Sequence, residues 1–504
     1  MGYKSSGLIL NQYKENIFQR SAIIIYIVLT VTYVLWRCCY TLNMDHIVAS
    51  LLFLLADMAT CFSAILFAVS FWRKPEHTAL LHGNHPEQLA VDVLVPTFNE
   101  DCAMLETTLR HCLDMDCPHQ TWLLDDGNRA EVKALAERLG VGYLSREDNA
   151  GAKAGNLNNA LQYTQGELIA VFDADFRPEK EFLTRLTDYF QDEKVAIVQA
   201  PQSYYNTDSF QHRRLSKKEI YSDQDTFMHL VLPARNNWNA AYWIGTNTLM
   251  RRSAIESIGG FPTDCVTEDV LTGMFIHSRG WKTVYVDEPL AYGRAPASIS
   301  EYVVQRLRWA QGAFQILRSH HPLFQKGLSL MQRLFYFASV NHFFEGAVKI
   351  VYYLLPSCFF LFGTVPIRPY PSIIIGMLFF VGTTRIILEL ITRGRTNLLL
   401  DDVYAVIRSF ICLWALPAFV SGKKIRFRVT PKADKPSFSL QGITGPGIIS
   451  GFNLAAIIAV TVNPYIVASL GTLGWICFGW CLYMGGIAFT ACYYCVKPLF
   501  NQTR

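Results

Sequence analysis

Long apolar stretches occupy both ends of the chain, and a block of more polar residues separates them. A helix that crosses a lipid bilayer needs about 20 mostly apolar residues. Six stretches meet that requirement, two before the polar block and four after it: Ser21–Thr41, Ile47–Phe71, Ala338–Gly363, Pro371–Ile391, Ile448–Pro464 and Val467–Val496. The hydropathy pattern therefore predicts six membrane-spanning helices in contact with membrane lipids.

Basic residues are unevenly distributed among the connections of these predicted spans. They gather before the first span, after each even-numbered span and at the end of the chain, as Arg20, Arg73, Lys424 and Arg504 illustrate. The short connections on the other side hold only Arg368. Lys and Arg concentrate on the cytoplasmic side of membrane proteins. We therefore expect both termini and the polar block to be cytoplasmic, at the inner (plasma) membrane.

Two further apolar segments contain charged residues. Ile299–His320 includes three arginines, which favours an amphipathic helix at the membrane interface. Leu400–Val420 opens with two aspartates and has Arg408 midway, so we expect it to lie along the cytoplasmic face. The alternative for the second segment is a seventh span, which would invert the last two helices.

The polar block alternates short apolar runs with helical stretches. Val91–Val95, Thr121–Leu124 and Glu167–Phe172 are predicted strands, and polar or acidic residues follow each one. Strands that alternate with helices indicate an α/β domain with a mostly parallel sheet, and ligands of such sheets bind beyond the carboxyl ends of the strands. We therefore divide the chain into a membrane region at 1–75, a cytosolic α/β domain at 88–325 and a second membrane region at 326–504.

Composition and charge exclude several classes of protein. Charged residues make up 17% of the chain, net charge is +4 and there is no Lys/Arg-rich arm, so we expect no nucleic-acid partner. The 13 cysteines are scattered, several of them inside apolar stretches, without the spacing of a zinc site or a disulfide framework. Free thiols fit a reducing cytosol around the polar block.

Two aspartates, Asp173 and Asp175, directly follow the apolar strand that ends at Phe172. Carboxylates at this spacing can share a hard divalent cation, Mg²⁺ or Mn²⁺, with the phosphates of a substrate. Such a cation would neutralise the charge that accumulates on a departing diphosphate. A solvated turn that binds no metal is the alternative interpretation.

A second acidic cluster, Thr267–Asp269, precedes a predicted helix at Val270–Arg279. The attack of a sugar hydroxyl needs a nearby carboxylate that accepts its proton, and a single displacement with inversion needs one such base. Asp269, with Glu268 beside it, is the candidate. The alternative is that Thr267 or Asp269 only caps the helix.

Several motifs occur in the order found in one enzyme family. The chain resembles family 2 glycosyltransferases of the cellulose synthase type in Asp125–Gly127, Asp173–Asp175, Thr267–Asp269 and Gln305–Trp309. Three further segments resemble that family's first nucleotide-contacting segment, its nucleotide-sugar loop and its gating loop: Pro96–Glu100, Gly151–Asn158 and Phe427–Lys432. The resemblance covers the chain from about Ser21 onward and implies a GT-A-type α/β domain, with a mixed, mostly parallel sheet, between helical transmembrane regions.

The resemblance also implies a role for each matching residue. Asp125 would hold the uracil base, Thr97 and Glu100 would contact the nucleoside, and Lys153 would approach the diphosphate. Asp173 and Asp175 would bind nucleotide and metal, and Asp269, with Glu268, would provide the base. The remaining implied substrate contacts are the acceptor residues Gly245, Thr246, Gln305, Arg308 and Trp309 and the gating-loop residues Phe427, Val429, Thr430 and Lys432.

The activity implied by the resemblance is processive, inverting transfer of glucose from UDP-glucose to the non-reducing end of a growing β-glucan, coupled to translocation of the polymer. An accessory protein on the outer face would receive the product. The family usually has Phe-Phe-Cys-Gly-Ser near the acceptor, whereas this chain has Tyr242–Thr246, with Ile244 and Thr246 in place of Cys and Ser. A β-1,3 or mixed linkage therefore stays open beside a cellulose-like product.

Other functions also stay open at this point. The chain ends soon after its last apolar stretch, so we expect no in-chain cyclic-di-GMP-binding domain and no dependence on that nucleotide. A synthase of hyaluronan or chitin, using UDP-N-acetylglucosamine, would carry the same motifs. So would a non-processive transferase that acts on a lipid carrier. A transporter with a nucleotide-binding cytosolic block is an alternative from a different class.

Overall fold

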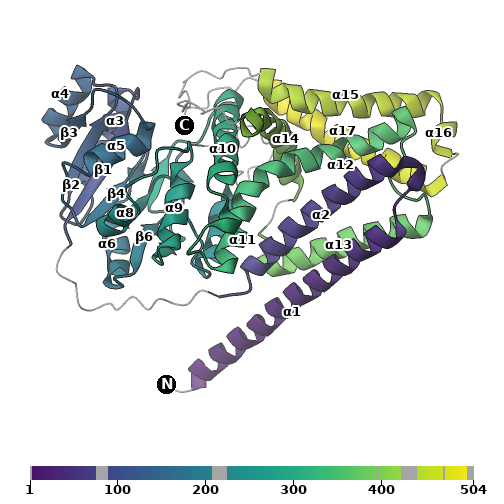
Figure 1. The fold of residues 1–504 in the computed structure, drawn as a ribbon, viewed down its shortest axis with the longest axis horizontal. Helices are drawn as coiled ribbons and strands as arrows, with labels where there is room; N and C mark the ends of the chain where they lie inside the picture. The colour runs from purple at the N-terminus through teal and green to yellow at the C-terminus, as the bar shows by residue number, and fades with distance from the viewer. Residues whose placement is uncertain are drawn as a thin grey trace. The chain divides into compact units, whose positions relative to one another are not determined.

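The computed structural model describes residues 3–74, 89–206, 224–395, 398–421, 440–468 and 471–496. It divides into two compact units (Figure 1). The first unit comprises 1–73, 341–417 and 434–504, and the second comprises 74–340 and 418–433. Segments from both ends of the chain therefore share the first unit.

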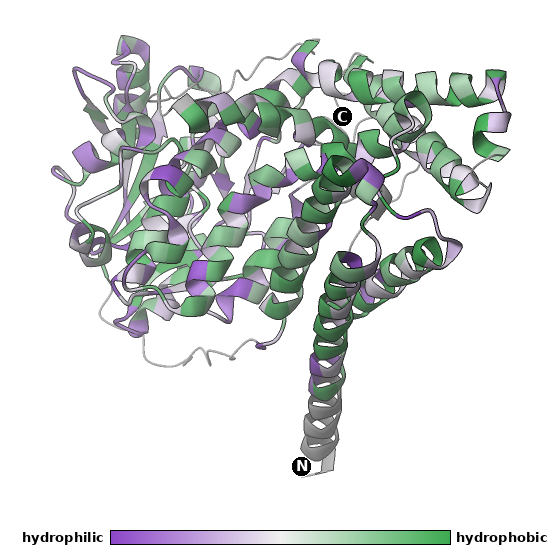
Figure 2. Cartoon of the chain, turned by 45° about the vertical axis from the view of Figure 1, so that its right-hand side comes forward, coloured by the Kyte–Doolittle hydropathy of each residue, from purple (hydrophilic) through white to green (hydrophobic). Residues whose placement is uncertain are grey.

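Helices make up the described part of the first unit, and all of its α-helices except α16 are long. They are α1 (Tyr3–Tyr40), α2 (Ile47–Ser70), α12 (Glu345–Phe362), α13 (Pro371–Thr392), most of α14 (Leu398–Ser421), α15 (Leu440–Val462), α16 (Tyr465–Ala468) and α17 (Gly471–Val496). Figure 2 shows hydrophobic residues along most of the helix that follows the N-terminus.

The prediction of six helices able to span a membrane is confirmed. Within the described ranges, six helical segments are long and apolar enough: Asn16–Tyr40, Met44–Ser70, Leu330–Phe362, Pro371–Thr392, Leu440–Val462 and Gly471–Val496. α14 is not among them, in agreement with its charged residues.

Five of these segments begin at a different residue from the predicted span, and only the one at Pro371 begins as predicted. Among the five are the last two predicted spans. α15 begins at Leu440 rather than Ile448, because the helix continues through Pro446. Within α15, Gly445 packs closely against Phe410 of α14, because a β-carbon at Gly445 would lie 2.4 Å from the Phe410 ring. The predicted last span merges α16 with α17, whereas α17 begins at Gly471, whose φ of +54° favours glycine.

A buried ion pair joins the two N-terminal helices. The Arg37 guanidinium on α1 lies 2.7 Å from the Asp57 carboxylate on α2, and both side chains are buried. The Tyr33 hydroxyl donates to Asp57 at 3.0 Å and the Tyr352 hydroxyl of α12 donates at 2.8 Å. Three helices therefore meet at one carboxylate.

A seven-stranded sheet forms the centre of the second unit, in the order β3-β2-β1-β4-β8-β6-β9. Its strands are β1 (Val91–Thr97), β2 (Gln120–Asp125), β3 (Gly142–Ser145), β4 (Leu168–Val171), β6 (Val195–Gln199), β8 (Thr248–Arg251) and β9 (Lys282–Tyr285). Only β8 runs antiparallel to its neighbours, β4 and β6, so the predicted mixed, mostly parallel sheet is confirmed. A small second sheet contains β5 (Arg177–Pro178), β10 (Ala291–Gly293) and β7 (Ser203–Tyr204).

Helices cover both faces of the large sheet (Figure 1). On β1, Val91, Val93 and Val95 pack with α3 (Cys102–Leu113), α4 (Ala130–Leu139) and α6 (Phe182–Thr187). Leu94 points the other way and packs with α5 (Ala152–Ala160), α8 (Arg252–Ser257) and α9 (Glu268–Ser278). The remaining α-helices of this unit are α7 (Leu232–Asn236), α10 (Ile299–Ser319) and α11 (Leu330–Asn341), which ends one residue beyond its boundary.

Capping residues fix where the helices next to the strand ends begin. Asp101 accepts a hydrogen bond from the backbone N–H of Met104 at 2.8 Å and begins α3, directly after the loop that follows β1. Ser298 accepts one from the N–H of Glu301 at 3.2 Å and begins α10. These caps set the length of the loops at the carboxyl ends of the strands.

Candidate active site

One cavity of about 740 Å³ lies beyond the carboxyl ends of β1 and β4. Most of the predicted site residues line it: Thr97, Glu100, Lys153, Asp173, Asp175, Gly245, Glu268, Asp269, Gln305, Arg308 and Trp309. The predicted gating-loop residues Phe427, Val429, Thr430 and Lys432 lie outside the described residues. Segments more than 200 residues apart in sequence therefore converge on a single cavity.

Asp173 and Lys153 form an ion pair in this cavity. The Lys153 ammonium also donates to the carbonyl of Gly245 at 2.6 Å. Thr246 is fully buried and does not line the cavity; instead its hydroxyl accepts a hydrogen bond from the backbone N–H of Asp173 at 2.9 Å. Thr246 therefore positions Asp173, and this contact could not be predicted from the sequence.

Gly245 lies between the cationic and acidic groups of the cavity. Its φ is +95°, and a β-carbon there would lie 3.3 Å from Oδ2 of Asp269 and 3.9 Å from Nζ of Lys153. The backbone conformation favours glycine, and a β-carbon would also crowd the Asp269 carboxylate. The absence of a β-carbon at Gly245 thus keeps space open beside Asp269.

The carboxylates of Asp173 and Asp175 fit a divalent cation that a diphosphate also binds. Both residues line the cavity, and Asp173 is partly exposed there. Within the described ranges, no group of three or more His, Cys, Asp or Glu residues could enclose a metal ion by itself. Mg²⁺ is commonly held by one or two carboxylates together with substrate phosphates. The donor set therefore suits an ion bound jointly by protein and substrate.

Glu268 and Asp269 begin α9 and face the cavity. The side chain of Thr267, which precedes them, makes no capping hydrogen bond, so Thr267 does not act as the predicted alternative cap. Burial and then the neighbouring charge of Asp269 raise the pKa of Glu268 to about 7, against the opposing charge of Lys153. Burial also raises the pKa of Asp269.

The raised pKa of Glu268 predicts a pH-dependent effect of Glu268→Gln on stability. Between pH 4.5, the ordinary glutamate value, and about 7, the folded protein binds more protons than the unfolded chain. The contribution of Glu268 to the free energy of unfolding is therefore greatest below this window and is lost as pH rises through it. We expect Glu268→Gln to stabilise the protein by about 2–3 kcal/mol more at pH 8 than at pH 4.5, at about 1.4 kcal/mol per pKa unit.

Thermal unfolding of the detergent-solubilised protein at pH 4.5 and pH 8 checks this prediction. Glu181→Gln, at an exposed glutamate, is the control and should change the melting temperature equally at both pH values. If the melting temperatures of Glu268→Gln and wild type differ by the same amount at both pH values, the assigned pKa is contradicted.

Helix α10 brings Gln305, Arg308 and Trp309 to the cavity. The guanidinium of Arg306 lies over the Trp309 ring, 4.2 Å from its centre, and holds the indole in place. Arg308 acts electrostatically on both Glu268 and Asp269 and favours their charged forms. The helix therefore places an aromatic ring and a cation near the candidate base.

Close packing joins α10 to the loop that precedes the candidate base. A β-carbon on Gly312 would lie 2.3 Å from the hydroxyl oxygen of Thr267, so only glycine fits. The backbone N–H of Val266 also donates to the side-chain oxygen of Gln315 at 3.0 Å. A glycine inside an amphipathic helix pattern often marks such a close approach, and this signal could have identified Gly312 from the sequence.

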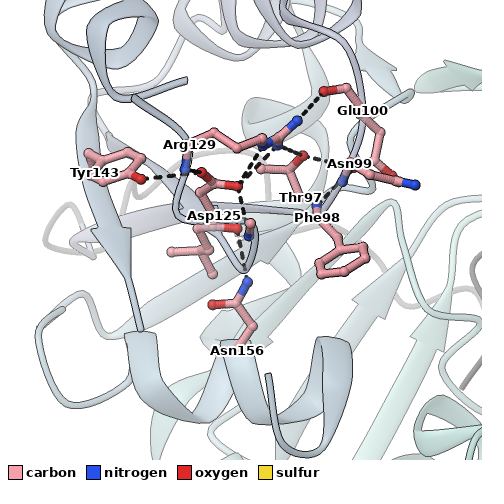
Figure 3. Close-up of polar contacts among 10 residues, drawn as sticks. Thr97, Phe98, Asn99, Glu100, Asp125, Arg129, Tyr143 and Asn156 are labelled. Atoms are coloured by element: carbon pink, nitrogen blue, oxygen red, sulfur yellow. Dashed lines mark hydrogen bonds and ion pairs between the residues drawn. The ribbon is translucent and has the colours of Figure 1, made fainter. Parts of the chain in front are cut away.

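The two aspartates of Asp125–Gly127 have different positions. Asp125 is fully buried and does not line the cavity, whereas Asp126 does. Asp125 therefore lies behind the cavity wall, and its contact with the uracil base, which the resemblance implies, stays a prediction. Its carboxylate accepts hydrogen bonds from neighbouring residues (Figure 3).

Family models match two consecutive parts of the chain. Residues 92–259 match glycosyl transferase family 2, and residues 256–397 match the cellulose synthase family. Cellulose synthase 1 of Komagataeibacter xylinus is 33% identical over 436 residues, which cover 83% of this chain and 28% of that relative. The chain belongs to the cellulose synthase group of family 2 glycosyltransferases.

Other relatives in this group agree with the assignment. The cellulose synthase catalytic subunit [UDP-forming] of Pseudomonas fluorescens is 32% identical over 365 residues, which cover 71% of this chain and 49% of the relative. The chain thus spans less than half the length of these two curated relatives.

A solved structure supports the fold. A mannosyltransferase from Pyrobaculum calidifontis, in complex with GDP-Man and Mn²⁺, matches with a TM-score of 0.53 and 17% identity. The match covers 74% of this chain and 99% of that structure. At this level of identity the similarity shows a common GT-A fold and nothing about the substrate.

Proposed function

We propose that the chain is a processive, inverting hexosyltransferase that adds glucose from UDP-glucose to the non-reducing end of a β-glucan and passes the polymer across the membrane. The observation that carries this proposal is the convergence of three groups on one cavity: the pair Asp173 and Asp175, the candidate base Asp269, and Trp309 with Arg308 on α10. A diphosphate sugar and an acceptor sugar need these three kinds of group within one space.

Transfer would proceed in a single displacement. The acceptor hydroxyl oxygen forms a bond to the anomeric carbon as the bond from that carbon to the diphosphate oxygen breaks, which releases UDP. The hydroxyl proton moves to the carboxylate of Asp269, which lies beside the space that Gly245 leaves open. Lys153 and Arg308 supply positive charge that stabilises the departing diphosphate.

Asp173 and Asp175 would hold Mg²⁺ or Mn²⁺ together with the donor. When bound, this ion supplies charge neutralisation for the leaving diphosphate. We therefore expect an excess of a divalent-metal chelator to abolish incorporation of sugar, and added Mg²⁺ or Mn²⁺ to restore it. Full incorporation after removal of metal would contradict the assignment of Asp173 and Asp175.

Trp309 would hold the end of the growing polymer. An indole ring stacks on the apolar face of a pyranose, and the Arg306 contact fixes its orientation. Retention of the acceptor end between additions would make synthesis processive. The six helices long enough to span a membrane would provide the path outward, with the cavity on the cytoplasmic side, as the distribution of Lys and Arg predicts.

The identity of the donor and the linkage of the product are the most specific parts of the proposal. The curated relatives are described as cellulose synthases, one of them as UDP-forming, which favours UDP-glucose and a β-1,4 product. Ile244 lines the cavity where a cysteine is usual in the family, so β-1,3 and mixed linkages are outcomes to be tested.

Incubation of the purified protein with radiolabelled UDP-glucose and Mg²⁺ or Mn²⁺ tests the proposal. Insoluble labelled polymer should form, and digestion with linkage-specific β-glucanases identifies the bond. Incorporation from UDP-N-acetylglucosamine alone would reassign the donor to that of hyaluronan or chitin synthesis. Short soluble or lipid-linked products would contradict processivity, and no incorporation from any donor would contradict the enzymatic proposal.

A further inference from the structure

Asp125 is an anchor inside the protein and not part of the cavity wall. Its Oδ1 accepts hydrogen bonds from the N–H of Gly127 at 3.1 Å and from Nη2 of Arg129 at 3.0 Å. Its Oδ2 accepts from the N–H of Arg129 at 2.7 Å and from the Tyr143 hydroxyl at 3.2 Å. A fully buried carboxylate with this many donors is already solvated by the protein, so the Asp125–Arg129 pair is a fixed unit.

The guanidinium of Arg129 extends from this anchor to the loop after β1 (Figure 3). Nη1 donates to the carbonyl of Glu100 at 2.5 Å, and Nη2 donates to the hydroxyl of Thr97 at 3.0 Å. The Thr97 hydroxyl in turn donates to the Glu100 carboxylate at 2.7 Å, which also accepts the backbone N–H of Phe98 at 2.9 Å. Thr97, Phe98 and Glu100 all line the cavity, so Arg129 fixes one wall of it.

Asp126 anchors a second arginine that extends to the other side. Its carboxylate accepts Nε and Nη2 of Arg146 at 2.5 and 2.7 Å. Arg146 also donates to the carbonyls of Ala150 and Ala152 at 2.7 and 2.9 Å. These carbonyls belong to the segment that leads to Lys153. The two adjacent aspartates thus fix two different loops through two different arginines.

We propose that Arg129 is a positioning residue for the nucleoside end of the donor site, acting through Thr97–Glu100, while Arg146 positions the diphosphate end through the segment before Lys153. This inference rests on the proposed function. A planar guanidinium suits the role because its fork bonds the carboxylate and the loop at once, whereas a lysine ammonium cannot span both.

Binding of two probes distinguishes the nucleoside end of the donor site from its diphosphate end. UDP contains nucleoside and diphosphate, whereas inorganic pyrophosphate contains the diphosphate alone. Arg129→Lys keeps a positive charge beside Asp125, so the protein should fold, but the contacts with the loop are lost. We expect it to raise the dissociation constant of UDP at least about tenfold, as for the loss of charge-assisted hydrogen bonds, and to change that of pyrophosphate less than twofold. Arg146→Lys should weaken both probes.

Binding of UDP and of pyrophosphate, each with Mn²⁺, is measured by titration calorimetry on the full-length protein in detergent. Arg138→Ala is the control. This exposed arginine lies on α4, the helix that follows Arg129, and among the described residues it contacts only Glu106. UDP binding by Arg129→Lys within twofold of wild type, or equal weakening of both probes, would overturn the inference. Wild-type protein that binds pyrophosphate but not UDP would instead overturn the uridine donor of the proposed function.

Discussion

Asp269→Asn should reduce the rate of sugar transfer by about 10²- to 10⁴-fold, the range usual for loss of a general base. Asparagine has nearly the same shape as aspartate, but its amide cannot take the proton of the acceptor hydroxyl. The loss should therefore fall on kcat and not on binding of the donor.

Initial rates of incorporation from radiolabelled UDP-glucose, together with the dissociation constant of UDP, check this prediction. Asp192→Asn removes a carboxylate of similar size at the surface, where it pairs with Lys282 at 2.7 Å, and should leave both quantities unchanged. More than a tenth of wild-type activity in Asp269→Asn would rule out Asp269 as the base. A large rise in the dissociation constant of UDP with unchanged kcat would assign Asp269 to donor binding.

Arg37→Met should destabilise the helical unit by about 3–5 kcal/mol, the usual cost of removing one partner from a buried ion pair. The substitution leaves the Asp57 carboxylate buried between α1 and α2, where its remaining partners among the described residues are the hydroxyls of Tyr33 and Tyr352. Asp57→Asn should be similarly harmful, because it leaves the Arg37 charge uncompensated. The double substitution Arg37→Met with Asp57→Asn should regain most of the loss, since it buries no charge.

Thermal unfolding in detergent, followed by size-exclusion chromatography, measures the four members of this double-mutant cycle. Arg385→Met, at an exposed position on α13 of the same unit, is the control. If the double variant is as unstable as the sum of the single variants, the two charges do not act as a pair. If neither single variant loses stability, the pair does not support the helices.

The sequence by itself determined the features that depend on local pattern. About 20 consecutive apolar residues are sufficient to predict a membrane-spanning helix, because the lipid cannot hydrogen-bond to the backbone. The described part of the chain contains six helices of this length and composition. Alternation of strands and helices was sufficient for the α/β class. Even so, the start of α15 was misplaced, because the helix begins at Leu440 and continues through Pro446.

Part of the candidate site was predictable from the sequence, because some residue types indicate the chemistry that they can perform. Asp173, Asp175 and Asp269 were predicted from the chemistry of carboxylates, whereas the roles of Lys153 and of Gln305–Trp309 came from the family resemblance. These residues line one cavity, with the exception of the residues between Gln305 and Arg308. Their convergence follows from topology, since the carboxyl ends of β1 and β4 lie side by side.

Only the tertiary structure decided which of these side chains face the cavity and which support it. Asp125 and Asp126 are identical neighbours in sequence, yet one is fully buried against Arg129 and the other lines the cavity. Thr246 supports Asp173 from outside the cavity, and Gly312 lets α10 approach Thr267. Arg129 follows Asp125 at i+4, so burial and not distance along the chain distinguishes Asp125 from Asp126. The contacts of Thr246 and Gly312, in contrast, join residues that are far apart along the chain. The sequence therefore determines the chemistry available to the site, and long-range packing determines its geometry.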